Sequence, residues 1–123
     1  MRLNLDRDNS QNIIRAYAVG LITVNEQTIE RSVIVTPTRL INDWPPQRFT
    51  ELEAAHLAQL AVLKPEIVLL GTGARQQFPS PQVTHPLLSQ GIGVEVMDTA
   101  AACRTYNIIM LEGRRVAAAL LMI

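Results

Sequence analysis

The segment that decides the fold is Pro65-Glu66-Ile67-Val68-Leu69-Leu70-Gly71-Thr72-Gly73, where an apolar run leads into a Gly-x-Gly corner. The run is too short for a helix, and an apolar stretch of this length is typical of a buried strand in a parallel sheet. Neither glycine carries a Cβ, so the backbone of the corner can approach another group closely. We therefore predict that residues 66–70 form a central strand.

Helices and strands alternate around this strand. Thr50 and Glu53 have the spacing of a capping box, which predicts a helix that runs to Lys64 and is closed by Pro65. After the corner, the pattern predicts a short helix within residues 82–90 and a strand at 94–97. Asp98-Thr99 is a good N-cap for a helix that ends near Gly113. The apolar segment 116–123 is expected to be a second central strand.

The first third of the chain has a different pattern. We expect residues 1–10 to form a polar arm or a short edge strand, and residues 11–36 to form a hairpin or three-stranded meander with a turn at 25–27. The last strand of this meander is expected to span 28–36. The proline-rich loop 37–48 contains Trp44, which is either an exposed anchor for a partner or, as we favour, a lid over the sheet edge.

These elements predict one α/β domain over residues 1–123. Strands alternate with helices in its α/β part, residues 50–123, which is built on the leading meander.

Composition limits the function. Eleven basic and eleven acidic side chains cancel, which argues against nucleic acid or an anionic membrane as the main partner. The adjacent pair Arg114-Arg115 is interpreted as a strand-end feature. The longest apolar run has eight residues, too few to span a membrane, and the N-terminus lacks a signal-peptide pattern. We expect a soluble, cytoplasmic protein without direct membrane insertion.

No catalytic or metal-binding set can be assembled from the sequence. Cys103 has no disulfide partner and is interpreted as a small residue packed in a helix. His56 and His85 are far apart, and His56 is expected at the surface. We therefore predict no metal, no cofactor and no catalytic residues.

Two groups of residues are candidates for binding. The glycine corner lacks the third glycine of a dinucleotide motif, because position 76 is Gln76, and the chain has no P-loop. Two interpretations stay open for the corner: a structural tight turn, or a small-ligand or anion site at the carboxyl end of a strand. The second group lies on the helix that follows Asp98. The candidate binding residues are Gly71, Thr72, Gly73, Arg104, Thr105, Tyr106, Asn107, Glu112 and Arg114.

Structural roles are the alternatives for the second group. Helical spacing projects Arg104 and Asn107 together and Tyr106 to a more apolar side. Glu112 is expected to pair with Arg114 or Arg115, and Asn107 to bind loop amides at the glycine corner.

The joint pattern of these residues resembles a known family. The residues that carry the likeness are Pro65-Glu66, Gly71-Thr72-Gly73, Thr99, Ala102, Thr105-Tyr106-Asn107, Glu112-Gly113-Arg114, Val116 and Ala118-Ala119-Leu120. The family contains mitochondrial complex I assembly factor three, the adipogenesis-associated Mth-domain protein and short prokaryotic proteins of unknown function. The likeness covers residues 13–120, with Ile109 where members often carry leucine.

The resemblance implies a single compact three-layer α/β domain, in which helices flank a central mixed sheet and the N-terminal meander forms an extra layer. It implies no established catalytic activity. It also implies that residues 71–73, 104–107 and 112–114 gather at one end of the sheet. We therefore expect a non-catalytic interaction protein or assembly factor whose partner is a respiratory or membrane complex subunit. The alternative is a small-molecule or anion-binding domain, or an enzyme, that uses the Gly71–Gly73 corner. Self-association through an edge of the meander is left open.

Overall fold

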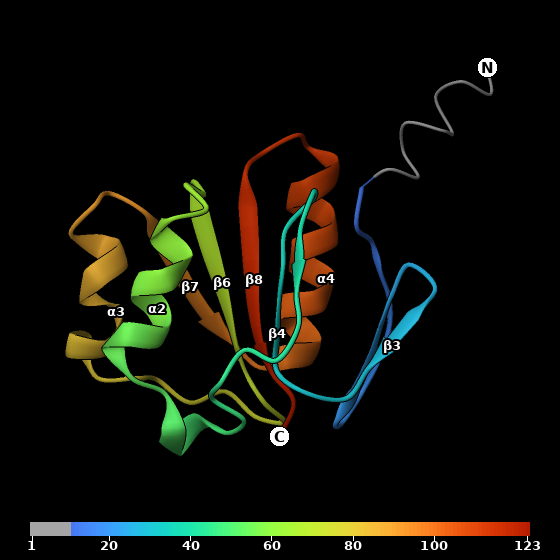
Figure 1. Ribbon diagram of the computed structural model, residues 1–123, viewed down its shortest axis with the longest axis horizontal. Helices are drawn as coiled ribbons and strands as arrows, with labels where there is room; N and C mark the ends of the chain where they lie inside the picture. The colour runs from blue at the N-terminus through green and yellow to red at the C-terminus, as the bar shows by residue number, and fades with distance from the viewer. Residues whose placement is uncertain (1–10) are drawn as a thin grey trace.

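The computed structural model describes residues 11–123, and its centre is a mixed five-stranded sheet (Figure 1). The strand order is β5-β4-β8-β6-β7. β6 pairs in parallel with β7 and β8, whereas β4 pairs antiparallel with β5 and β8. The strands of this sheet are β4 (Val33–Val35), β5 (Leu40–Ile41), β6 (Ile67–Thr72), β7 (Gly93–Met97) and β8 (Val116–Leu121).

The sequence predicts two central strands, and the structure confirms both of them as β6 and β8. β8 and β6 are inner neighbours, and all six residues of β8 are buried. Ala118 and Leu120 face one core, while Ala117, Ala119 and Leu121 face the other. Because three of these side chains are alanines, the layers on both faces can lie close to the strand.

Helices cover both faces of this sheet (Figure 1). α2 (Ala54–Ala61) and α3 (Pro81–Leu88) lie on one face, where Leu57, Leu60 and Leu87 are fully buried. α4 (Thr99–Leu111) lies on the opposite face and buries Ala102, Tyr106 and Met110 among others. A short 3₁₀ turn, η1 (Phe49–Glu51), precedes α2.

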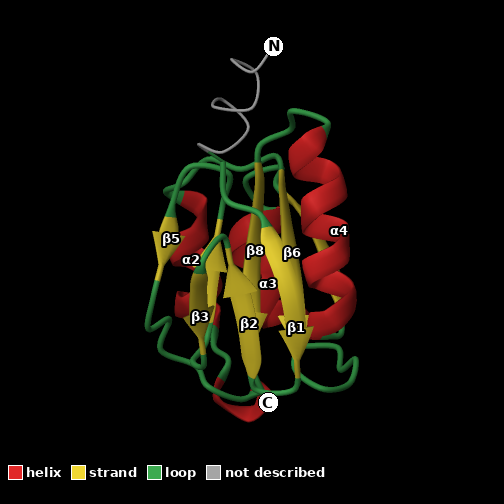
Figure 2. Cartoon of the chain, turned by 90° about the vertical axis from the view of Figure 1, so that its right-hand side faces the viewer, coloured by secondary structure: helices red, strands yellow, loops and turns green. Residues whose placement is uncertain are grey.

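A separate antiparallel sheet of order β1-β2-β3 lies on the α4 side (Figure 2). Its strands are β1 (Ile14–Ala18), β2 (Leu21–Val24) and β3 (Gln27–Ile29). Apolar side chains of this sheet share one core with α4, β4 and β8. The predicted fold class is therefore confirmed: helices flank a central mixed sheet, and the meander adds a layer.

The prediction of one strand over residues 28–36 is wrong. The chain leaves the small sheet after Ile29, passes through residues 30–32, and enters the five-stranded sheet as β4. Ile29 and Val33 are both buried, so the apolar pattern alone does not distinguish one strand from two in different layers. The predicted arm, residues 1–10, lies outside the described residues.

The predicted boundaries of α2 are wrong at both ends. Thr50 lies in η1, and the N-cap is Glu53, whose backbone N–H donates to Nδ1 of His56 at 2.9 Å. Leu52 is buried with an extended backbone, which prevents a helix from continuing through it. At the other end Lys64 adopts φ = 54°, outside the helix. His56, expected at the surface, is only partly exposed, and its ring centroid is 6.3 Å from that of the buried indole ring of Trp44.

The start of α4 is as predicted, since Oδ1 of Asp98 accepts a hydrogen bond from the N–H of Ala101 at 2.8 Å. α3 begins at Pro81, where a missing N–H costs nothing, and it contains Pro86. Trp44 is fully buried in the core beneath α2, so it covers apolar residues of the sheet and is not an exposed anchor.

Candidate functional site

The glycine corner at the carboxyl end of β6 is filled by protein groups. The N–H of Gly73 donates to Oγ1 of Thr99 at 2.8 Å, and the Thr99 hydroxyl donates to the carbonyl of Leu121 at 2.6 Å. A Cβ on Gly71 would lie 2.9 Å from the same hydroxyl. Thr99 therefore occupies the inner space that the glycines leave open, and it joins the ends of β6, β8 and α4.

The outer part of the corner is also tied together. Gly73 has φ = +100°, and a Cβ there would lie 2.5 Å from the carbonyl oxygen of Ile123. The Thr72 hydroxyl is 2.8 Å from the carbonyl of Arg75 and accepts the N–H of Gln77 at 3.1 Å. Beside this loop is a hollow of about 320 Å³ whose lining includes the side chains of Arg48 and Arg75.

The α4 candidates attach this helix to β1. The Asn107 side chain accepts the N–H of Ile14 at 3.0 Å and donates to the Ile14 carbonyl at 2.7 Å. The expectation that Asn107 binds amides at the glycine corner is therefore wrong. The hydroxyl of Tyr106, on the buried side of the helix, donates to the carbonyl of Asn12 at 2.8 Å, and burial raises the pKa of this phenol. Thr105 is half-buried on the same helix.

Arg104 and Asn107 do share one side of α4, as predicted. They border a hollow of about 460 Å³ between α4 and β1, together with Arg15 and Cys103. Burial raises the pKa of the Cys103 thiol to about 12, against a smaller opposing effect of the Arg104 charge. The thiol is therefore protonated at neutral pH, and since the thiolate is the nucleophile, this site favours packing over reactivity.

Glu112 and Arg114 lie at the other end of the molecule. α4 follows β7 and precedes β8, so its N-terminus is at the carboxyl end of the parallel strands and its C-terminus is at their amino end. A helix of thirteen residues is about 20 Å long. The expectation that the three groups of candidate residues gather at one end of the sheet is wrong.

The ion pair at this end also differs from the prediction. Nε of Arg114 is 3.2 Å from Oε1 of Glu66, and Nη1 of Arg115 is 3.7 Å from Oε2 of the same carboxylate. Glu66 precedes β6, so the arginines before β8 link two neighbouring strands. The predicted partner, Glu112, is not the one the arginines contact.

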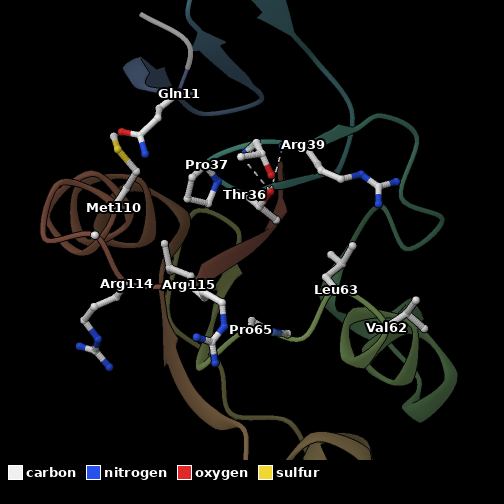
Figure 3. A pocket seen from close by; sticks show the side chains of 13 residues that line it. Gln11, Thr36, Pro37, Arg39, Val62, Leu63, Pro65, Met110, Arg114 and Arg115 are labelled. Carbon is white, nitrogen blue, oxygen red and sulfur yellow. Dashed lines mark hydrogen bonds between the residues drawn. The ribbon is translucent and has the colours of Figure 1, made fainter. Parts of the chain in front are cut away.

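A hollow of about 450 Å³ lies at the amino ends of β6 and β8 (Figure 3). We call it the arginine hollow, because Arg39, Arg114 and Arg115 line it. The remaining lining comes from the turn after β4, the ends of α2 and α4, and the chain just before β1, before β6 and at the start of β8: Gln11, Thr36, Pro37, Thr38, Val62, Leu63, Pro65, Met110, Gly113 and Val116. Sequence reasoning named Arg114 as a candidate binding residue but missed Arg39 and Arg115, although the adjacent arginine pair was a signal for a site here.

The part of the chain that the structure describes contains no cluster of three or more His, Cys, Asp or Glu side chains placed to hold a metal ion. In the same part, none of the helices combines the length and the apolar character needed to cross a membrane.

These features define a class of small α/β domain in which a mixed sheet carries helices on both faces and a meander beside α4. The chain belongs to the family described as "Protein of unknown function (DUF498/DUF598)", whose sequence model matches residues 14–121. This match confirms the resemblance that the sequence pattern indicates.

Similar proteins include both solved structures and a named assembly factor. A Bordetella parapertussis protein of known crystal structure is 45% identical, with a TM-score of 0.87 and coverage of 93% of this chain and 98% of that one. A Bordetella pertussis protein described as a Mth938-like domain is 38% identical, with a TM-score of 0.80 and coverage of 90% and 85%.

The zebrafish (Danio rerio) NADH dehydrogenase [ubiquinone] 1 alpha subcomplex assembly factor 3 is 32% identical over 111 residues, or 89% of this chain. The aligned part is 63% of that relative, so the chain spans less than two thirds of its length.

Proposed function

We propose that the chain is a non-catalytic assembly factor that acts at the cytoplasmic side of a respiratory complex through contacts with an unassembled subunit. The observation that carries this proposal is the 32% identity to an NADH dehydrogenase assembly factor over 89% of the chain. The aligned length corresponds to nearly all of the α/β domain and its meander, so the similarity concerns a folded unit and not a short motif.

The geometry supports the proposal because several polar side chains that stood out in the sequence make contacts within the fold. Asn107 binds both backbone groups of Ile14, and the Thr99 hydroxyl bridges Gly73 and Leu121. A general acid or base must be able to reach a substrate proton, and these groups are already hydrogen-bonded inside the protein. Meanwhile Ile108 and Leu111 on α4 are well exposed, which suits a surface that contacts other proteins.

Affinity capture tests the proposal. The tagged chain is expressed in cells of its source organism, cross-linked and purified, and the captured proteins are quantified by mass spectrometry. We expect enrichment of respiratory NADH dehydrogenase subunits over a control in which an unrelated tagged domain of similar size is expressed. Recovery of no such subunit, together with turnover of a metabolite by the purified chain, would overturn the proposal.

An anion-binding role at the glycine corner is a second candidate. The observation in its favour is the hollow of about 320 Å³ beside Thr72, with Arg48 and Arg75 in its lining. A ligand at 100 times its dissociation constant stabilises the folded state by about 2.7 kcal/mol. Thermal unfolding with organic anions and nucleotides should then show an increase in Tm that Arg75→Ala removes. Equal increases for the wild type and this variant would contradict the role.

A further inference from the structure

The floor of the arginine hollow is apolar. Met110 and Val116 are almost completely buried beneath it, and Pro65 is buried beside them. Val62, at the end of α2, keeps 78% of its surface exposed on the rim. An apolar side chain placed here would remove both its own surface and that of Val62 from water, which is favourable in proportion to the area.

One wall of the hollow is held rigidly. The Thr36 hydroxyl accepts the N–H groups of Thr38 and Arg39 at 3.3 and 2.9 Å. The side-chain amide of Asn12 donates to the carbonyls of Thr36 and Arg39, both at 2.9 Å. The polar backbone groups of this turn therefore have partners, and the turn presents a fixed surface to the hollow.

The guanidinium groups of Arg39, Arg114 and Arg115 supply hydrogen-bond donors to the hollow. Each has five N–H donors. Arg114 uses Nε for Glu66, and Arg115 uses Nε for the carbonyl of Lys64 at 3.1 Å. Within residues 11–123 the side chain of Arg39 makes no hydrogen bond or ion pair. The unused N–H groups are forked donors that match the geometry of a carboxylate.

The local charge balance favours an anion. Lys64 adds a cation between Leu63 and Pro65, which line the hollow, whereas Glu66 and Glu112 are the carboxylates that adjoin lining residues in the chain. The helix dipoles place about half a negative charge at the C-terminus of each of α2 and α4, and this charge partly offsets the positive charge of the arginines. In α4 this effect is reduced, because the N–H groups of Gly113 and Arg114 bind the carbonyls of Met110 and Ile109. The hollow is therefore cationic in a chain whose formal net charge is zero.

We propose that the arginine hollow binds a segment of a partner protein in which an apolar side chain lies beside one or two carboxylates. The apolar group would contact Val62 and Met110, while the carboxylates would bind Arg39 and the free N–H groups of Arg114 or Arg115. This inference rests on the proposed function, since it names the chemistry of the contacted protein. A protein segment suits the site better than a small ligand, which needs 70–90% of its surface buried, whereas this hollow is open to solvent.

The probe is a blocked pentapeptide with leucine between two glutamates and glycine at each end. It is titrated into the full chain labelled with ¹⁵N, and amide chemical shifts are followed. We expect saturable shifts in the amides of Thr36, Thr38, Arg39 and residues 113–116, and no saturable shifts with a peptide that has lysines in place of glutamates. Saturable shifts confined to another surface, or equal responses to both peptides, would overturn the proposal.

Charge reversal locates the contact. Arg39→Glu should weaken peptide binding about tenfold or more (about 1.4 kcal/mol), because it replaces a cation that would bind a carboxylate with a like charge. Arg104→Glu is the matched control, since Arg104 is exposed on α4, lies outside the lining of the arginine hollow and, like Arg39, makes no side-chain hydrogen bond or ion pair within residues 11–123. Equal affinities for the two variants would contradict the proposal. If Arg39→Glu does not fold, Arg114→Gln, which removes a partly exposed charge, replaces it.

The two proposals fail separately. Capture of respiratory subunits that is unaffected by Arg39→Glu, together with an unresponsive peptide titration, would remove the hollow as the docking site and leave the assembly role. Specific peptide binding without recovery of any respiratory subunit would support the hollow and contradict the assembly role.

Discussion

At the scale of single residues, Gly73 shows how little space the corner leaves. Its φ of +100° and the position of the Ile123 carbonyl make a side chain costly for two independent reasons. Gly91 has φ = +77°, but no neighbouring atom lies within 4 Å of the point that a Cβ would occupy, so a substitution there reports the backbone strain alone.

We expect Gly73→Ala to lower the free energy of unfolding by about 2–4 kcal/mol, from backbone strain and overpacking together. Gly91→Ala should cost about 1–2 kcal/mol. Urea unfolding of both variants measures the difference. Equal losses of unfolding free energy in the two variants would contradict the close approach of Gly73 to the Ile123 carbonyl.

Asn107 is the residue whose role the sequence predicted least well. Its amide fastens β1 to α4, and β1 is an edge strand of the small sheet. Asn107→Ala should cost about 1–3 kcal/mol, because it leaves two backbone groups of Ile14 without partners. Arg104→Ala, on an exposed position of the same helix, should cost much less. If Asn107→Ala and Arg104→Ala lose comparable unfolding free energy in urea, Asn107 does not hold β1 against α4.

The raised pKa of Cys103 predicts that the free energy of unfolding depends on pH. Its pKa is raised from 9.0 to about 12, mainly by burial, so the folded chain holds the proton more tightly than the unfolded chain does. This contribution is fully present below pH 9 and is lost as pH rises through the window from 9 to about 12.

Cys103→Ala should therefore reduce the decline in unfolding free energy across that window, although the raised pKa values of Tyr17 and Tyr106 leave part of it. Urea unfolding at several alkaline pH values gives the slope. An unchanged slope in the variant would show that the thiol has a normal pKa in the folded chain.

At the scale of elements, the sequence predicts most helices and strands but not their partners. The capping signal at Asp98 is followed at once by a helix, and the apolar runs of β6 and β8 are bounded by glycine or arginine. For α2, two residues could cap the helix, Thr50 and Glu53, and burial of Leu52 decides between them. That burial depends on the sheet beneath, which no local pattern contains.

The start of α2 can be tested by substitution. His56→Ala removes the acceptor for the N–H of Glu53 and the edge contact with Trp44, and it should cost about 0.5–2 kcal/mol. Thr50→Ala lies in the exposed 3₁₀ turn and should change stability by less than about 0.5 kcal/mol. A larger loss of stability for Thr50→Ala than for His56→Ala would indicate that Thr50, and not Glu53, is the N-cap of α2.

At the scale of the whole molecule, topology explains why the candidate residues separate. Residues 71–73 and 112–114 are near opposite ends of α4, and a helix that connects two parallel strands must run antiparallel to them. The order of β7, α4 and β8 along the chain therefore already implies that residues 71–73 and 112–114 lie at opposite ends of the sheet. The arginine hollow could not be foreseen in the same way, because it combines Arg39, after β4, with residues that precede β8.

We propose that the chain assists assembly of a respiratory complex. The most direct measurement is the amount of assembled NADH dehydrogenase in membranes of source cells that lack the chain, separated on native gels and stained for activity. We predict less assembled complex and an accumulation of smaller subassemblies, both restored by the wild-type chain. Normal amounts of complex in the cells that lack the chain would contradict the account.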